Sequence, residues 1–301
     1  MDTLESMSIF VRVVERGSFS AVARELGLSQ PTISKHISAL ETRLGGRLFA
    51  RSTRQLSMTD EGKRYYQHCR AILACVENAE HTFHAGQERI AGSLRIGSSG
   101  SFGRVQIASR LHGFLALYPE VSVDMQLSDE NVDLLSAGID VAVRIGELKD
   151  SGLLARKIGL TRRCVFAAPS YLERHGVPAT PNDLARHNCL VFNQLEHFAS
   201  WRFEHNGRWR SVQVSGNVRS NNSEAIRQMV LSGLGVSLSP SWLFRQDLSE
   251  GRVVAILESY VPASLPIHAV TLPDRRQSAR VRAFTDYLRD AFAGDSDVCL
   301  G

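Results

Sequence analysis

A row of small polar side chains and one cation lies at helical spacing between residues 31 and 42. At 100° per residue, an α-helix would display Pro31, Ser34, Lys35, Ser38 and Thr42 on one face. An ordinary solvated helix carries a mixture of Glu and Lys there, whereas small hydroxyls and one cation can enter the major groove of DNA. A surface helix of a small bundle is the alternative, because short helical hairpins are common.

The surrounding sequence is basic and predicts a hairpin. Residues 30–57 contain the single acid Glu41 against five basic residues, Lys35, Arg43, Arg47, Arg51 and Arg54. In LFARSTRQLSMT, residues that favour strands flank a polar tip that carries Arg51 and Arg54. This pattern predicts a wing hairpin whose arginines lie against the phosphate backbone or reach into the minor groove.

Three short helices are expected to position this face. The first ends at Gly17, and Ser18 is a good N-cap for a second helix that ends at Gly27. Ser29 can cap a third helix, which tolerates Pro31 in its first turn. The inward stripe of this third helix is apolar and consists of Ile33, Ile37, Leu40 and Leu44. Two helices joined by so tight a turn form a helix-turn-helix.

A long helix should follow, from Thr59 to about residue 87. It would span roughly 40 Å, which is too long to be buried on a sixty-residue domain. Its apolar seam has near-heptad spacing and consists of Cys69, Ile72/Leu73, Val76, Ala79 and Phe83, with Tyr65/Tyr66 upstream. The projecting part is expected to pair with its copy in a second chain. Packing against its own domain is the alternative.

After residue 89 the pattern changes to α/β. Three segments are predicted to be strands: Leu94 to Gly97, VSVDMQL and IDVAVRIG. A tight turn is predicted at SSGSFG and a helix from Val105 to Leu117. This alternation of strands and helices implies a parallel sheet. CVFAAPSYL and NCLVF read as strands of a second small sheet, to which EAIRQMVLSGLGVSLSP adds a helix and a strand. RVRAFTDYLRDAF should be a helix packed back on a sheet.

Composition and motifs exclude several classes of protein. The 301 residues, 43% hydrophobic and 22% charged, suit two or three globular domains. No run approaches the roughly 18 to 20 apolar residues of a membrane span, and the amino terminus does not resemble a secretory signal, so a cytoplasmic protein is expected. The five cysteines are too scattered for a disulfide framework or a metal site. No GxSxG, HExxH or GxxxxGK[ST] segment is present, so no catalytic residues are expected.

Blocks along nearly the whole chain resemble one family, the LysR-type bacterial transcriptional regulators. They begin with SFSAVARELGLSQPTISKHISALETRLGGRLFARSTRQLSMTDEGKRYY and continue through LYPEVSVDMQLSD, GIDVAVRIGELKDSGLLARKIG and SGLGVSLSP. The resemblance implies an α/β protein with a winged helix-turn-helix domain (1–58) and a dimerising linker helix (59–88). It further implies a two-lobed, Rossmann-like effector-binding domain (89–301) similar to type 2 periplasmic binding proteins. Lobe I would comprise about 92–163 and 268–301, and lobe II about 164–267.

The resemblance also assigns residues that contact DNA. Carried over one by one, these are Gln30, Pro31, Thr32, Ser34, Lys35 and Ser38 on the third helix, with Arg51 and Arg54 in the wing. The chemistry agrees, since glutamine can bond an adenine edge, a threonine methyl can meet a thymine methyl and lysine can reach guanine or a phosphate. His36 is expected to be a packed helix residue and not a base reader.

In the effector domain, two helix N-termini should face one cleft and could bind an anion. Ordinary helix capping is the alternative for each residue, and a structural ion pair is the alternative for Arg144, which resembles the cleft position of the family. The candidate effector-binding residues are Ser98, Ser99, Ser101, Arg144, Asn222 and Ser223. The effector would be a small molecule, with no cofactor or metal. The remaining partners implied are double-stranded DNA, a second copy in a homodimer that assembles to a homotetramer, and RNA polymerase as a further candidate.

Two other functions are alternatives to a regulator controlled by a small molecule. A solute-binding protein would share the second domain, but it would need an export signal and would have no helix-turn-helix. A redox-sensing regulator of the same family, with Cys164 and Cys189 near the lobe junction, stays open as the alternative.

Overall fold

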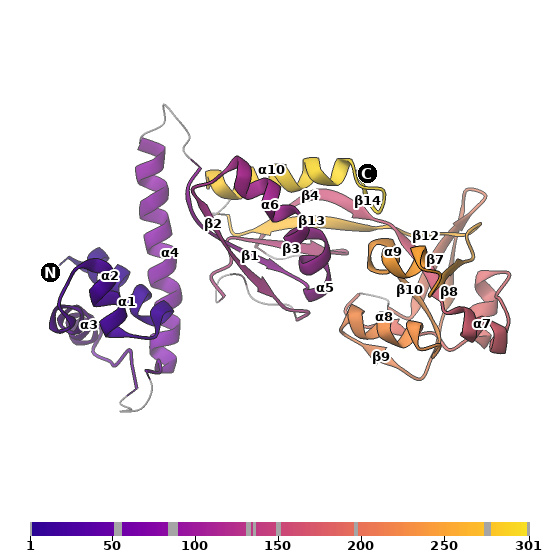
Figure 1. The fold of residues 1–301 in the computed structure, drawn as a ribbon, viewed down its shortest axis with the longest axis horizontal. Helices are drawn as coiled ribbons and strands as arrows, with labels where there is room; N and C mark the ends of the chain where they lie inside the picture. The colour runs from indigo at the N-terminus through magenta and orange to yellow at the C-terminus, as the bar shows by residue number, and fades with distance from the viewer. Residues whose placement is uncertain are drawn as a thin grey trace. The chain divides into compact units, whose positions relative to one another are not determined.

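The structure is a computed structural model that describes residues 2–50, 56–83, 90–130, 134, 137–148, 152–195, 198–273 and 278–299, with side chains described only to Val76 in the long helix. Residues 1–89 form one compact unit, and most of residues 90–301 form a second (Figure 1). Among the residues described, no helix combines the length and apolar character needed to cross a membrane.

The first unit begins with the three predicted helices, α1 (Thr3–Arg16), α2 (Phe19–Leu26) and α3 (Gln30–Leu44). The predicted caps are confirmed, because Ser18 accepts from the Ala21 N–H and Ser29 accepts from the Thr32 N–H, both at 3.3 Å. Gly27 ends α2 at φ 64°, a conformation that residues with a Cβ rarely adopt. The tight turn between α2 and α3 is therefore encoded locally.

The core of this unit lies between α1, α3 and the start of α4. Ile33, Ile37 and Leu40 of α3 are buried, as the periodicity predicts. Leu44 is 45% exposed, so its predicted place in the inward stripe is wrong. It occupies the last position of α3, where the helix ends at Gly45 and no longer packs on the core.

The base of the predicted wing is a short antiparallel contact. Phe49 pairs with Met58, and the Ala50 N–H donates to the Ser57 carbonyl at 2.8 Å. The tip, with Arg51 and Arg54, lies outside the described residues.

The long helix α4 (Asp60–Phe83) follows, and Thr59 caps it by accepting from the Gly62 N–H at 2.9 Å. Its predicted seam divides in two. Cys69 is fully buried in the core of its own domain, so placing it in a contact between chains is wrong. Ile72, one turn later, is 40% exposed. The first four turns, as far as Leu73, therefore anchor the helix on its own domain, and within the last of them the apolar side chain of Ile72 remains on the surface.

The second unit contains a six-stranded sheet in the order β14-β4-β13-β3-β1-β2. Its strands are β1 (Gly92–Ser98), β2 (Val121–Leu127), β3 (Val141–Ile145), β4 (Leu154–Thr161), β13 (Leu265–Thr271) and β14 (Val298–Cys299). The prediction of a parallel sheet is correct only for β2, β1 and β3, since β13, β4 and β14 pair antiparallel. The chain enters β13 at the edge where β3 ends, so the two strands must run in opposite directions. We call this sheet and its helices lobe I.

The helices of lobe I are α5 (Gly100–Phe102), a π-helical segment η1 (Gly103–Ala108), α6 (Ser109–Leu117) and α10 (Ala279–Ala293). The prediction of a tight turn over SSGSFG is wrong, because helical structure begins at Gly100. The tail helix is confirmed, and four apolar residues at helical spacing in it are buried: Val281, Phe284, Leu288 and Phe292. Helix α10 lies along the sheet (Figure 1).

Residues 163–262 form the part that we call lobe II. One antiparallel sheet has the order β10-β5-β11, with β10 (Val236–Pro240), β5 (Arg163–Ala167) and β11 (Val254–Ile256). The other strands are β6 (Val191–Phe192), β7 (Ser200–His205), β8 (Arg208–Gln213), β9 (Arg219–Ser220) and β12 (Val261–Pro262). The helices are α7 (Pro169–His175), the 3₁₀ segment η2 (Pro181–Arg186), α8 (Ser223–Leu231) and α9 (Ser241–Ser249).

Two predictions for lobe II need correction. NCLVF joins the sheet of CVFAAP only through Cys189, which pairs in parallel with Val236 of β10, whereas Val191–Phe192 pairs in parallel with β9. The last residues of CVFAAPSYL are helical, since Pro169 fixes the first turn of α7. β13 begins at Leu265, slightly before the predicted return to lobe I at residue 268; the predicted domain and lobe boundaries otherwise stay predictions.

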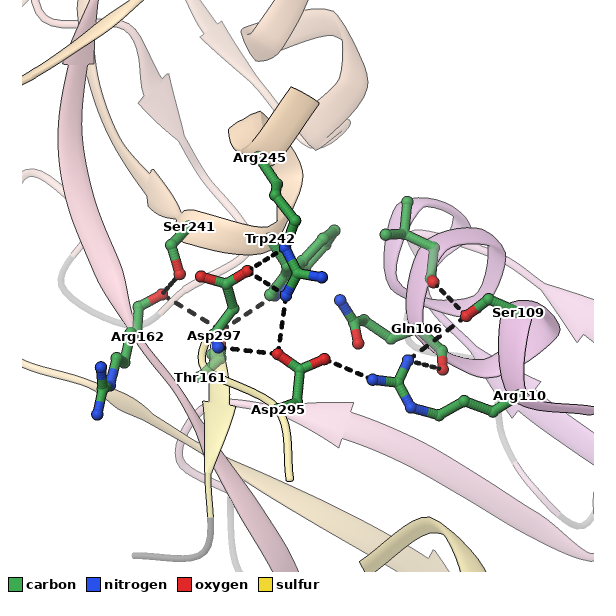
Figure 2. Close-up of polar contacts among 11 residues, drawn as sticks. Gln106, Ser109, Arg110, Thr161, Arg162, Ser241, Trp242, Arg245, Asp295 and Asp297 are labelled. Atoms are coloured by element: carbon green, nitrogen blue, oxygen red, sulfur yellow. Dashed lines mark hydrogen bonds and ion pairs between the residues drawn. The ribbon is translucent and has the colours of Figure 1, made fainter. Parts of the chain in front are cut away.

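A polar network joins the lobes on the side of α9 (Figure 2). Trp242 of α9 donates to Thr161 at the end of β4, at 3.0 Å. Arg245, also on α9, pairs with Asp295 and Asp297 near the C-terminus, and Arg110 of α6 pairs with Asp295 as well. Burial acts to raise the pKa of Asp295, but the Asp297 N–H and the two arginines more than offset this and lower it. The carboxylate is thus held ionised between two lobes.

Candidate functional site

The predicted DNA-contacting face of α3 lies largely on the surface. Gln30, Pro31, Lys35 and Ser38 are exposed, as is Thr42 one turn later. The remaining two predicted residues, Thr32 and Ser34, are half-buried. No bulky apolar residue interrupts the row, so the face can approach another surface closely.

Neighbouring groups orient the first turn of this face. The Gln30 Oε1 atom accepts from the Ser20 hydroxyl of α2 at 3.1 Å, and its amide nitrogen has no hydrogen-bond partner among the described residues. Thr32 and Ser29 share a hydrogen bond of 2.8 Å between their hydroxyls. Lys35 forms no ion pair with any described residue, so its charge is available to a phosphate or a guanine.

His36 packs inside the domain, as predicted. It is 5% exposed, and its Nδ1 atom lies 2.9 Å from the Ser6 hydroxyl of α1. Glu41 has a structural role as well: it pairs with Arg47 at 2.8 Å and accepts from the Leu48 N–H at 2.9 Å. One of the five basic residues of the segment is therefore neutralised, and the turn that leads into the wing is fixed.

In the second unit, the two predicted helix N-termini do face each other. The Ser223 hydroxyl at the start of α8 donates to the Ser101 hydroxyl of α5 at 3.0 Å. Asn222 caps α8 by accepting from the Ala225 N–H at 2.8 Å. The sequence prediction that these two turns line one cleft agrees with this contact, although capping already occupies part of their polar surface.

Asp129 is a residue of this site that sequence reasoning missed. Its carboxylate accepts from the Gly100 N–H at 2.9 Å and from the Asn222 side-chain amide at 2.6 Å. An acidic group of the chain itself therefore occupies the N-terminus of α5, where the sequence predicts an external anion. In the sequence, the feature that could have identified Asp129 is its position two residues after strand β2, at the edge where the parallel strands end.

The other predicted residues lie along the same edge. Ser98 is 8% exposed, and its hydroxyl has no hydrogen-bond partner among the described residues. Ser99 is the N-cap position of α5 but makes no side-chain cap bond. Ser98 pairs with Val143, so Arg144 follows at the carboxyl edge of β3. Arg144 faces His268 of β13 across the strand pair.

A cavity of about 110 Å³ lies at this edge, between the lobes. Lobe I contributes Gly146, Glu147 and Leu265, and lobe II contributes Arg163, Phe192, Leu195, Phe198, Ser200, Trp201 and Leu238. None of the six predicted effector residues lines it. The cavity is adjacent to them nonetheless, because Gly146 follows Arg144 by two residues.

Arg163 is the second residue that the sequence did not single out. Its Nε atom donates to the Ala263 carbonyl at 2.6 Å, and it has no carboxylate partner among the described residues. Burial lowers the pKa of its guanidinium to about 10, so the group stays protonated at neutral pH. In the sequence, the only local feature that could have identified Arg163 is the position of a cation directly before the apolar strand CVFAA.

The cysteine alternative receives no support from the geometry. Cys164 pairs with Ser239 of β10, whereas Cys189 pairs with Val236 from the other edge of that strand. The Cα atoms of Cys164 and Cys189 are therefore separated by two strand spacings of about 4.8 Å each. This distance exceeds the ~7 Å between Cα atoms that a disulfide can span. Burial raises the pKa of the Cys189 thiol to about 12 and also raises that of Cys164. Both thiols are therefore poor nucleophiles.

Two protein-family models match the chain. The model described as bacterial regulatory helix-turn-helix protein, lysR family, matches residues 4–63. The model described as LysR substrate binding domain matches residues 87–293. Together they include the α3 face, the cleft residues and the cavity.

Individual proteins are similar over nearly the full length. The chain is 37% identical to an HTH-type transcriptional regulator of Xanthomonas campestris pv. campestris, over 99% of this chain and 88% of that protein. It is 34% identical to the HTH-type transcriptional regulator DmlR of Escherichia coli, over 96% and 94%. Among solved structures, CrgA, a LysR-type transcriptional regulator from Neisseria meningitidis, matches with a TM-score of 0.61 and 32% identity, over 97% and 99%.

Proposed function

Because the chain belongs to the LysR family, and is thus a DNA-binding transcriptional regulator with an effector-binding domain and not an enzyme, we propose that α3 reads its operator in the major groove. The observation that carries this is the exposed row on α3, where Gln30 is oriented by Ser20 and Lys35 is unpaired among the described residues. The base-contacting residues proposed are Gln30, Pro31, Thr32, Ser34, Lys35 and Ser38. Arg51 and Arg54 of the wing are proposed to hold the phosphate backbone.

Substitutions on α3 and in the wing should affect DNA binding differently. Gln30→Ala and Ser34→Ala should weaken binding to the cognate operator by about 1–3 kcal/mol, with little effect on random DNA, because base contacts carry the specificity. Arg54→Ala should weaken binding to both duplexes and flatten the dependence of log affinity on log salt. Fluorescence anisotropy with an operator selected from genomic fragments measures both effects.

The control is Ser8→Ala on α1, which makes the same chemical change as Ser34→Ala outside α3. It should leave both affinities unchanged. Equal losses on cognate and random duplexes for Gln30→Ala would exclude the groove assignment.

For the second unit, the proposed effector is a small molecule bound between the lobes. Support comes from the two helix N-termini that meet at Ser101 and Ser223, with Ser98, Ser99, Asn222 and Arg144 along the same edge. Asp129 adds a constraint, because an anion that approached the N-terminus of α5 would have to displace its carboxylate. The effector would shift an existing equilibrium between lobe arrangements by binding one of them better.

Substitutions in this cleft should remove the response to the effector. Arg144→Ala, Ser99→Ala and Asn222→Ala each delete a polar group at the edge, and regulation of a reporter by cell extract should fall to its unstimulated level. Val177→Ala, at an exposed position of lobe II outside the cleft, serves as the control and should respond like wild type. An unchanged response in all three cleft variants would show that the signal enters elsewhere.

The proposed assembly is a homodimer through α4 that pairs into a homotetramer. Support comes from Ile72, whose side chain is exposed although the neighbouring Leu73 packs on the core of its own domain. One helix-turn-helix makes few base contacts, so a dimer that spans two half-sites would bind more tightly. The proposed place of action is the cytoplasm, with double-stranded DNA and RNA polymerase as partners.

A further inference from the structure

The cavity between the lobes combines apolar walls with one cation, Arg163, that has no carboxylate partner in the part of the chain that the structure describes. Phe192, Phe198 and Trp201 supply aromatic surface, and Leu195, Leu238 and Leu265 supply aliphatic surface. Its volume of about 110 Å³ approaches that of apolar cavities which hold a benzene molecule, roughly 150 Å³. The cavity can therefore hold the body of a small organic molecule.

The charge in the cavity is the feature that selects a ligand. Arg163 uses its Nε atom for the Ala263 carbonyl, and the rest of its fork has no carboxylate partner among the described residues. Arg163 is half-buried, so its charge is partly desolvated without a counter-charge, and a bound anion would offset that cost. A guanidinium pairs best with a planar carboxylate, which accepts two parallel hydrogen bonds.

We propose that this cavity binds a small organic carboxylate with an aromatic or branched aliphatic body, and that Arg163 binds the carboxylate group. The inference rests on the proposed function, since the cavity belongs to the same interlobe cleft and its ligand would be the effector. Glu147 also lines the cavity, but its side chain is exposed at the rim. It can add an ammonium contact for a ligand that carries one.

The location of Arg163 explains how such a ligand would act on the lobes. Arg163 is the first residue of β5, immediately after the chain leaves lobe I through β4. Ala263, its hydrogen-bond partner, lies between β12 and β13, where the chain returns to lobe I. Both crossing segments thus meet at this side chain. A carboxylate on Arg163 would bind at the hinge and against walls from both lobes.

The test uses the full-length chain and defined probes. Titration calorimetry would compare benzoate with benzamide, and 3-methylbutanoate with its amide and with L-valine, which adds only an α-ammonium group. Wild type should bind the carboxylates with millimolar or tighter dissociation constants, at least tenfold more tightly than the amides. Arg163→Met should lose at least tenfold in affinity for the carboxylates and no longer distinguish acid from amide. Quenching of tryptophan fluorescence, to which Trp201 at the cavity wall contributes, gives a second readout.

Arg162→Met is the matched control, because it makes the same change one residue away at an exposed side chain that does not line the cavity. It should bind the probes like wild type. The acid and amide comparison on wild type needs no variant, so the test holds even if Arg163→Met folds poorly. A preference for L-valine over 3-methylbutanoate would assign an amino acid as the carboxylate source; the reverse preference would assign a simple acid.

Two results would overturn the assignment: no carboxylate binding by wild type at millimolar concentration, or equal binding of acid and amide. The proposed function fails by a different result. If carboxylates bind through Arg163 but saturation leaves operator affinity unchanged, the cavity is a carboxylate site and the effector role is refuted.

Discussion

Replacing Asp247 by asparagine should lower the free energy of unfolding of the second unit by about 3 kcal/mol. The Asp247 side chain on α9 is fully buried and accepts two hydrogen bonds from Arg227 of α8, at 2.6 and 2.7 Å. Arg252 pairs with it at 2.7 Å. The substitution would leave buried positive charge without its counter-ion, which is why the loss exceeds that of an ordinary hydrogen bond. In the variant, Arg227 keeps its ion pair with Glu224 at 2.7 Å. The loss of stability should therefore stay near the lower end of the range measured when one partner of a buried ion pair is removed.

The ion pair between Asp247 and Arg227 also holds the proposed effector site in position. Arg227 lies one turn from Ser223 and Asn222, so a loosened α8 should weaken the effector response as well. Chemical denaturation measures the stability change, and Asp290→Asn is the control because Asp290 is 69% exposed in its pair with Arg289. The control should change stability by less than about 1 kcal/mol. If Asp247→Asn unfolds at the wild-type midpoint, the network does not stabilise the domain.

Replacing Ile72 by glutamate should break the proposed contact between two copies of α4. The side chain is 40% exposed on α4, directly after the turns that Tyr66 and Cys69 bury in their own domain. In a dimer through this helix, two copies of the new carboxylate would be desolvated near each other without a cation, at a cost of several kcal/mol. Light scattering should show a lower mass, and operator affinity should fall because two half-sites are no longer bound together.

Leu117→Glu provides the matched control, since Leu117 is an even more exposed leucine, at 63%, on a helix of lobe I. This variant should keep the wild-type mass. A folded Ile72→Glu protein with the wild-type mass would show that α4 does not form the contact between copies.

The helix-turn-helix could be predicted from the sequence because its signals are local. Gly17 and Gly27 end helices, Ser18 and Ser29 begin them, and both capping hydroxyls accept the expected N–H groups. The exposed face of α3 follows from the same 100° periodicity that buries Ile33 and Ile37. Within α3, the predicted inward stripe fails only at Leu44, where the helix ends.

The cleft was predictable in part. Two turns rich in serine and asparagine mark helix N-termini, and the order of elements in an α/β fold brings such turns to one edge. The contact between Ser101 and Ser223 agrees with that reasoning. What no local pattern could show is that Asp129, from a third segment, already occupies the N-terminus of α5.

Tertiary structure alone decided the remaining features. β13 runs antiparallel to β3 because the chain re-enters lobe I from the edge where β3 ends, and strand direction depends on that path and not on residue pattern. Cys69 resembled an interface residue by spacing, yet it is buried in the core of its own domain. Arg163 resembled any surface cation in the sequence; its partial burial, and the pairing of its Nε with Ala263 one hundred residues away, arise only when two crossing segments meet. Helix caps and faces depend on neighbours within a few residues, whereas pairing, burial and charge environment depend on contacts between distant segments.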